Sequence, residues 1–197
     1  YITQAALGGI DKVINQEKPD RVLVHGDTTT TLAASLAAYY HRIPVGHVEA
    51  GLRTGNHYAP FPEEINRKLT DSIADIFFAP TNKAAENLIR EGVNPPQIIV
   101  TGNTVIDALI HTVGELRENP KQLKTFESRF DMIGKDRRLI LVTGHRRENF
   151  GDGFRRICHA LRTIASRGDV EIIYPVHLNP NVSSPVHSIL SDSPNIH

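Results

Sequence analysis

The sequence contains little that could cross-link the chain or hold it in a membrane. Its one cysteine, Cys158, excludes an intrachain disulfide framework and a multi-cysteine zinc site. Because Cys158 falls among the apolar positions of an expected helix, we interpret it as a core residue. No apolar run approaches the roughly 18–20 residues that a membrane span needs, and no signal peptide is visible. We therefore expect a cytoplasmic protein without a membrane partner.

The sequence also lacks an excess of charge of either sign. Its 22 Lys and Arg residues balance 22 Asp and Glu residues. Nucleic-acid-binding proteins usually carry a basic face and a high pI, so this balance argues against a nucleic-acid partner. The charge is uneven along the chain, because the part from Lys135 onward holds nine Lys and Arg against six Asp and Glu. A basic second half suits an anionic ligand, although chance asymmetry explains it equally well.

Short apolar strands alternate with helical patterns along the whole chain, which is typical of α/β proteins with parallel sheets covered on both faces. Four expected strands precede a polar stretch at 117–134, and two follow it. We therefore expect two doubly wound, Rossmann-like domains, at 1–116 and 135–197, joined by a linker at 117–134. The expected strands are 21–25, 44–48, 76–79, 98–101, 139–143 and 171–175, and the inward positions of three helices are Leu32, Leu36 and Tyr40; Ile65, Leu69 and Ile73; and Phe154, Ile157, Cys158, Leu161 and Ile164.

Neither end of the sequence resembles a natural domain edge. The chain starts at Tyr1 inside a helical pattern, and it stops at Ile196 and His197, which resemble the opening of another strand. We therefore expect a piece of a longer polypeptide, with both domains truncated.

Charged side chains follow several expected strands at the point where each strand ends. In open α/β sheets, ligands bind in the crevice at the carboxyl ends of the strands. Asp27 stands there, at the start of a helix, where either Asp27 or Thr28 could cap the helix. As a functional group, Asp27 would be a carboxylate at the mouth of the sheet. The threonines at 28–31 could also donate to a phosphate at the helix N-terminus.

Three further carboxylates lie in comparable positions. Glu49 ends a strand and opens a loop, where a purely structural Glu would pair with Arg53. Glu63 and Glu64 follow Pro62 in the first turn of a helix, where carboxylates favour the helix dipole in any case. The dipole explains one of the two carboxylates but not both.

Histidines and arginines complete the set of candidates. His145 ends a strand in the basic half and is followed by Arg146 and Arg147, which are suited to a diphosphate. The alternative is a charged surface loop. His25 and His47 end strands as well, and we expect at least one of them to be a hydrogen-bonded core residue. We expect no metal site, because His25 and Asp27 lack a third ligand at suitable spacing.

Taken together, the motifs at these strand ends resemble the non-hydrolysing UDP-N-acetylglucosamine 2-epimerases of bacteria. The resemblance runs along essentially the whole chain, and related glycosyltransferases share the fold but not this string of motifs. The matching segments are 25–31, 47–55, 61–67, 79–81, 101–104, 144–149 and 174–180.

The resemblance implies a glycosyltransferase-B architecture of two domains and the interconversion of UDP-GlcNAc and UDP-ManNAc for surface polysaccharides. It implies no redox cofactor and no metal, a homodimer, and UDP-GlcNAc as a possible allosteric ligand. It also implies that this chain covers about the middle half of the family's length, and we expect the chain alone to be inactive. The implied residues are Asp27, Glu49, Glu63 and His145 as catalytic groups, Arg53, Arg147 and Asn149 as substrate-binding groups, and Glu64, Arg146 and His177 in the allosteric site.

Three other functions remain open on the sequence. A glycosyltransferase with the same fold would need an acceptor, and a hydrolysing epimerase would release free ManNAc and UDP. A non-catalytic nucleotide-sugar sensor would bind the ligand without turnover.

Overall fold

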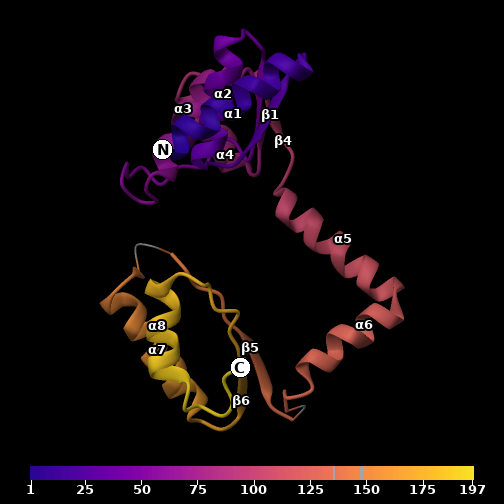
Figure 1. The fold of residues 1–197 in the computed structure, drawn as a ribbon, viewed down its shortest axis with the longest axis vertical. Coiled ribbons are helices and arrows are strands. Elements are labelled where there is room, and N and C mark those ends of the chain that lie inside the picture. Colours follow the sequence, from indigo (N-terminus) through magenta and orange to yellow (C-terminus); the bar gives the residue numbers. More distant parts are fainter. Residues whose placement is uncertain (135, 147–148) are drawn as a thin grey trace. The chain divides into compact units, whose positions relative to one another are not determined.

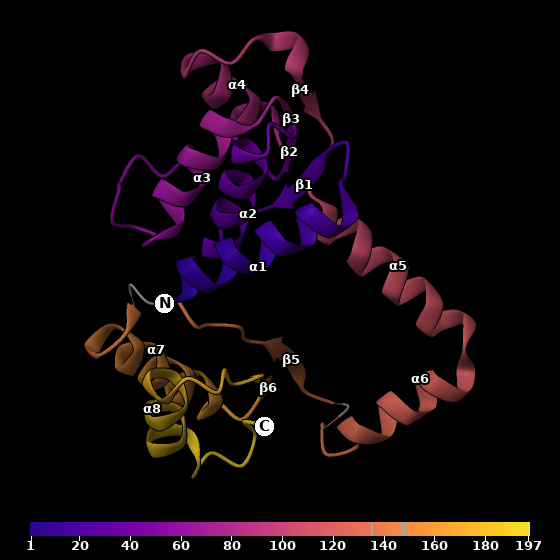
Figure 2. The ribbon, with the colours of Figure 1, turned by 45° about the horizontal axis from the view of Figure 1, so that its top comes forward.

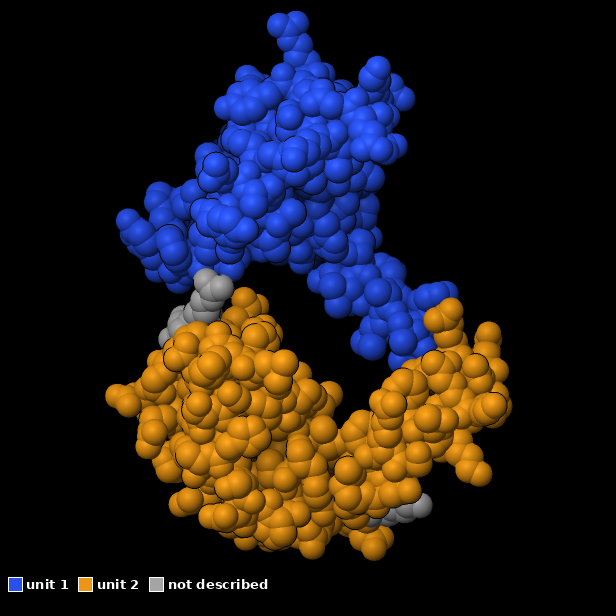
Figure 3. Space-filling model, in the orientation of Figure 1, with its two compact units in different colours: residues 1–114 blue, residues 115–197 orange. Residues whose placement is uncertain are grey.

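The computed structural model describes residues 1–134, 136–146 and 149–197, which form two compact units, 1–114 and 115–197 (Figure 3). Each unit contains one parallel sheet, in the order β1-β2-β3-β4 in the first and β5-β6 in the second. The expected α/β fold with parallel sheets is therefore confirmed.

In the first unit, strands and helices alternate without exception (Figures 1 and 2). The crossovers from β1 to β4 all run in one direction across the sheet, and right-handed crossovers then place their helices on the same face. On the opposite face of the sheet, Leu23 is 63% exposed and Ile99 is 44% exposed. Helices were expected on both faces of this sheet, and in this chain they cover one of them. The elements are α1 (Ile2–Glu17), β1 (Val22–His25), α2 (Thr29–Tyr40), β2 (Val45–Val48), α3 (Glu63–Ile73), β3 (Ile76–Ala79), α4 (Asn82–Arg90), η1 (Pro95–Gln97), β4 (Ile98–Val100) and α5 (Thr104–Glu118).

The second unit repeats the alternation on a smaller scale. Its two strands pair in parallel, and Ile196 adds an isolated parallel bridge to Ile172, as expected for the start of a further strand. Cys158 is fully buried in the core of this unit, as predicted. Burial also raises the pKa of its thiol. The elements are α6 (Pro120–Glu127), η2 (Ser128–Phe130), β5 (Arg138–Leu141), α7 (Asp152–Ala165), β6 (Val170–Ile173) and α8 (Pro180–Leu190).

The predicted inward faces of two helices are partly wrong, although Ile73 of α3 packs against the core as predicted. In α2, Tyr40 is 69% exposed and the leucines are half-buried, while small residues such as Ala33 and Ala38 are buried instead. In α3, Leu69 is 47% exposed and the buried residues are polar. Small side chains let α2 approach its neighbours closely, and the polar face of α3 has hydrogen-bonding partners described below. In α7 the predicted face holds for Phe154, Cys158 and Leu161, whereas Ile157 and Ile164 are each 37% exposed.

The stretch expected as a linker is largely helical. Helix α5 continues to Glu118, and α6 follows almost at once with Asn119 as its N-cap. The apolar positions of α5 are 57–65% exposed at Val105, Ile106, Leu109 and Ile110. None of the described helices is long and apolar enough to cross a membrane.

Candidate active site

The carboxyl ends of β1 and β2 bring Asp27 and Glu49 to one edge of the first sheet. The two strands pair in register from Val22 and Val45 to His25 and Val48. The Gly26 N–H then donates to Val48 O at 3.0 Å, which extends the pairing by one residue beyond β1. The ring Nε2 of His25 lies 3.8 Å from Glu49 Oε2. Two carboxylates and a histidine therefore converge at this edge.

Glu49 has an unusual backbone conformation. Its φ is +71°, in the left-handed region that non-glycine residues seldom adopt. The N–H groups of Glu49 and Ala50 both donate to Phe78 O, at 3.0 and 3.1 Å, and hold this conformation. Glu49 does not pair with Arg53, so the structural interpretation of Glu49 is wrong. Its side chain stays 29% exposed and packs against Gly26, where an added Cβ would lie 3.2 Å from Glu49 Oε2.

Asp27 is not the cap of the helix that follows it. Thr28 takes that position, because its Oγ1 accepts from Thr31 N at 3.1 Å. The Asp27 carboxylate instead accepts from Arg67 Nη2 at 2.5 Å and remains 28% exposed. The capping explanation is therefore wrong, and a functional role for the Asp27 carboxylate stays a prediction.

The turn that carries Asp27 is fixed by side chains from three other places in the chain. Its three successive carbonyl oxygens each meet one polar side chain. Thr31 Oγ1 donates to His25 O at 2.7 Å, His47 Nε2 lies 2.8 Å from Gly26 O, and Asn66 Nδ2 donates to Asp27 O at 2.9 Å.

The first turn of α3 presents the next two candidates differently. Glu63 is half-buried, whereas Glu64 is fully buried and accepts from the backbone N–H groups of Thr54, at 3.1 Å, and Gly55, at 3.0 Å. Burial alone would raise the pKa of Glu64, but these N–H groups and the nearby Arg67 outweigh it and lower the pKa. Glu64 therefore anchors the loop that follows Glu49.

Arg53, predicted to bind substrate, is held by two other carboxylates. Its guanidinium lies 2.7 Å from Asp71 Oδ2 and 2.6 Å from Glu91 Oε2, and its side chain is 8% exposed. Burial would lower its pKa, but the hydrogen bonds to Glu91 and Asp71 raise it overall. In this position Arg53 supports the loop, and its contact with substrate stays a prediction.

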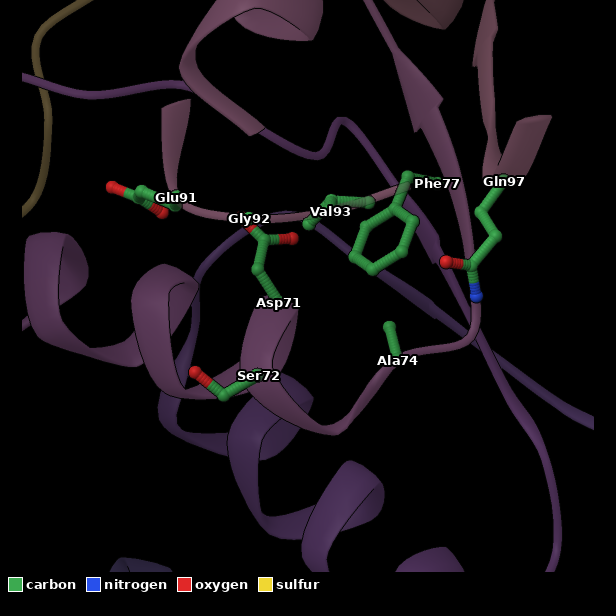
Figure 4. Close-up of a pocket in the computed structure, with 8 residues that line it drawn as sticks. All are labelled: Asp71, Ser72, Ala74, Phe77, Glu91, Gly92, Val93 and Gln97. Carbon is green, nitrogen blue, oxygen red and sulfur yellow. The ribbon is translucent and has the colours of Figure 1, made fainter. Parts of the chain in front are cut away.

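His47 is the core histidine that the sequence predicts. Its ring is fully buried, and Nδ1 lies 2.5 Å from Asp71 Oδ1. The other carboxylate oxygen of Asp71 accepts from Gly51 N at 3.3 Å and from Arg53. Asp71 also lines a cavity of about 240 Å³ beside the end of α3, together with Phe77 and Glu91 (Figure 4).

In the second unit, the loop after β5 carries the basic candidates. His145 and Arg146 are exposed, and the His145 ring stacks on the His177 ring with 5.3 Å between centroids. Asn149 is exposed as well, and its N–H donates to Arg146 O at 3.1 Å. Arg147 lies outside the described residues. The structure thus brings together His145 and His177, which the sequence assigns to two different sites.

The sequence reasoning missed Asp71, and it considered Thr31 only as a phosphate donor, whereas Thr31 Oγ1 donates to His25 O. A signal for Asp71 was available, because Glu64, Arg67 and Asp71 recur at helical spacing on one face of α3. A polar stripe on a helix that packs against a sheet indicates hydrogen-bonded partners there. Within the described ranges, no group of three or more His, Cys, Asp or Glu residues could hold a metal ion.

Solved structures define the class of the fold. The chain superimposes on a UDP-GlcNAc 2-epimerase from Neisseria meningitidis bound to UDP-GlcNAc with a TM-score of 0.96 and 46% identity, over all of this chain and 53% of that one. For the Methanocaldococcus jannaschii UDP-GlcNAc 2-epimerase in complex with UDP-GlcNAc and UDP, the TM-score is 0.81 and the identity 36%, over 98% of this chain and 53% of that one. The fold is therefore that of the glycosyltransferase-B class, present in part.

The sequence identifies the family within this class. All of residues 1–197 match the family described as UDP-N-acetylglucosamine 2-epimerase. The UDP-N-acetylglucosamine 2-epimerase of Escherichia coli K12 is 54% identical over 196 residues, which are 99% of this chain and 52% of the relative. The chain belongs to the UDP-N-acetylglucosamine 2-epimerase family, and it spans about half the length of the curated relatives it matches.

Proposed function

We propose that the intact protein is an isomerase that interconverts UDP-N-acetylglucosamine and UDP-N-acetylmannosamine without hydrolysing them. Family membership supports the reaction, and the observation that carries the proposal for this chain is the convergence of Asp27 and Glu49 at one sheet edge. Their half-exposed carboxylates are available to a ligand, while the backbone beneath them is fixed.

The reaction has to remove a proton that is not acidic in the ground state. The C2 proton of the sugar ring is not adjacent to a carbonyl, so direct abstraction is slow. When the bond from C1 to the diphosphate oxygen breaks, its electron pair leaves with UDP and C1 becomes oxocarbenium-like. A carboxylate can stabilise this charge, and a general base can then take the C2 proton. The products of this anti elimination are 2-acetamidoglucal and UDP, and re-addition with the proton on the opposite face inverts C2.

We assign the roles by the charge that each group has to meet. Asp27, Glu49 and Glu63 act at the sugar ring, where positive charge develops and protons move. His145 stabilises the departing diphosphate, with Arg147 and Asn149 as further contacts. For the proposed allosteric binding of UDP-GlcNAc, Arg146 and His177 contact the ligand, whereas the fully buried Glu64 acts through the loop that it holds. The stacking of His145, in the loop after β5, on His177, in the loop after β6, is consistent with neighbouring sites.

The test is turnover in a full-length chimera, in which residues 1–197 replace the matching half of the Escherichia coli relative. Incubation with UDP-GlcNAc alone should give an equilibrium mixture with UDP-ManNAc. Release of free ManNAc and UDP would instead indicate a hydrolysing epimerase. A chimera that binds UDP-GlcNAc but converts none of it would contradict the proposal and favour an acceptor-dependent transferase or a sensor.

Four further statements stay predictions. The 197-residue chain alone should show no epimerase activity. The intact protein should be a cytoplasmic homodimer, it should supply ManNAc units for surface polysaccharide, and its domains should be bounded at 1–116 and 135–197.

A further inference from the structure

The buried ring of His47 faces a hydrogen-bond acceptor on each side. Nε2 lies 2.8 Å from the carbonyl oxygen of Gly26, and Nδ1 lies 2.5 Å from Asp71 Oδ1. A carbonyl oxygen carries no proton, so Nε2 has to donate. One further proton lies between Nδ1 and Asp71 Oδ1, because two unprotonated atoms would not approach to 2.5 Å. The ring is therefore hydrogen-bonded on both sides, to Gly26 through Nε2 and to Asp71 through Nδ1.

The neighbouring groups fit this arrangement. Asp71 is 3% exposed and meets His47 through one carboxyl oxygen. Its other oxygen meets Arg53, which in turn meets Glu91. Direct contacts thus link His47, Asp71, Arg53 and Glu91 in series. Buried charges are tolerated when they are paired and hydrogen-bonded in this way.

The His47–Asp71 pair bonds to the backbone of two segments, and each segment carries one of the site carboxylates. Gly26 directly precedes Asp27, and its carbonyl meets His47. Gly51 is two residues beyond Glu49, and its N–H donates to Asp71 Oδ2 at 3.3 Å. A side chain at Gly51 would clash with α4, because an added Cβ there would lie 2.3 Å from Ala84 O, so the Gly51 backbone lies close against that helix. One buried pair therefore spans both segments.

We propose that His47 and Asp71 are positioning residues, which hold the Asp27 turn and the Glu49 loop at a fixed separation and thereby set the geometry of both carboxylates. This inference rests on the proposed function, because its kinetic consequence requires the epimerase reaction. Misplacement of a reacting group by about 1 Å can cost about 100-fold in rate. Neither residue has to touch the substrate for this effect.

The kinetic test compares two substitutions of Asp71 in the full-length chimera. In Asp71→Asn, the side-chain amide can donate to His47 Nδ1 while its oxygen accepts from Gly51 and Arg53. His47 then keeps its proton on Nε2, and every contact is kept. Asp71→Ala removes the link and leaves the neighbouring cavity without a polar partner for His47.

We expect Asp71→Ala to lower kcat by about 100-fold with KM within about threefold of the parent, which is the signature of lost positioning and not of lost binding. Asp71→Asn should restore kcat to within about fivefold of the parent. The matched control is Asp75→Ala, which removes a carboxylate paired with Arg21 just beyond the same helix and should leave both constants unchanged. If Asp71→Ala does not fold, His47→Asn replaces it, because its short amide cannot reach Gly26 and Asp71 at once.

Two results would overturn the positioning role. The first is a kcat within about threefold of the parent in folded Asp71→Ala or His47→Asn. The second is a loss in Asp71→Asn as large as in Asp71→Ala, since charge and not position would then be decisive.

A second measurement does not depend on turnover. In the 197-residue chain labelled with ¹⁵N-histidine, NMR should show a proton on Nε2 of His47 both in the parent and in Asp71→Asn, as the hydrogen bond to Gly26 O requires. In Asp71→Ala or, if that variant does not fold, His47→Asn, amide hydrogen exchange should accelerate at Gly51 and Asp27 and stay unchanged in Asp75→Ala. An Nε2 without a proton in the parent, or unchanged exchange at both amides, would refute the inference. An inactive parent chimera with these NMR results would instead count against the proposed function and leave the link intact.

Discussion

Both the Asp27–Glu49 edge and the His145 loop contain residues predicted to be catalytic. They differ in how firmly their surroundings hold those residues. At the edge, each carbonyl of the turn has a side-chain partner, and the loop after Glu49 is anchored by Glu64 and Asp71. In the second unit, His145, Arg146 and Asn149 are exposed. The carboxylates are therefore preorganised, as catalysis of proton transfer requires, whereas the basic loop has side chains available for an anion.

The largest effect should come from the preorganised carboxylates. Glu49→Gln in the full-length chimera removes one of the proposed catalytic carboxylates but keeps the shape, and kcat should fall by about 10³-fold, within the range for general acid–base catalysis. The measurement is conversion of UDP-GlcNAc to UDP-ManNAc. The matched control is Glu86→Gln, an exposed residue that pairs with Lys83 on α4 and should change nothing. Retention of a tenth or more of the activity by Glu49→Gln would remove Glu49 from the reaction.

A substitution in the basic loop should lower kcat less than Glu49→Gln does, and it should leave stability unchanged. His145→Ala should lower kcat by about 100-fold, because one charge-assisted contact to the leaving diphosphate is lost. Its melting temperature should stay within about 1 °C of the parent, since substitutions of exposed residues away from special features change stability little. His159→Ala, on an exposed position of α7, is the control. A clear fall in melting temperature would show that His145 contributes to stability, as the residues around the Asp27 turn do.

The free energy of unfolding should respond to substitutions at the first site and not to His145→Ala. Glu64→Gln replaces a buried acceptor of two backbone N–H groups with an amide that offers only one oxygen, and it should cost about 1–3 kcal/mol in the free energy of unfolding. Urea unfolding of the 197-residue chain measures this cost. Glu63→Gln, at the half-buried neighbour, should cost less than about 0.5 kcal/mol. Equal costs would show that Glu64 does not anchor the loop.

The cost of Glu64→Gln should also depend on pH. The pKa of Glu64 is lowered in the folded state, so its contribution to stability is complete above the unfolded pKa. It is lost as the pH falls through the folded pKa, which lies below the unfolded value. The difference in urea midpoint between parent and Glu64→Gln should therefore shrink on going from pH 6 to pH 3. A difference that is constant over this range would contradict the assigned charge.

The sequence predicted the strands well because β-branched and aromatic runs between turns are a local signal, as in Ile76–Ala79, which is found with the predicted bounds. It predicted Asp27 and Glu49 at strand ends for the same reason. It failed on the inward faces of α2 and α3, because a local pattern does not show what a face will meet. In α2, alanines offer a second apolar face, and close packing selects it. In α3, the buried polar face depends on loop N–H groups and on His47, which are distant in sequence.

The smallest predicted effect concerns the backbone of the preorganised site. Glu49 is held at φ +71°, which costs a non-glycine residue about 1–2 kcal/mol. Glu49→Gly should therefore be about 1 kcal/mol more stable to urea than Glu49→Ala, although both variants lose the carboxylate and the activity. Lys18 is the matched control, because it ends α1 with a φ of +46° and is not a candidate site residue. Lys18→Gly should therefore be more stable than Lys18→Ala for the same backbone reason. If Gly and Ala are equivalent at position 49 but differ at position 18, Glu49 is not strained, and the fixed N–H groups of Glu49 and Ala50 alone account for its conformation.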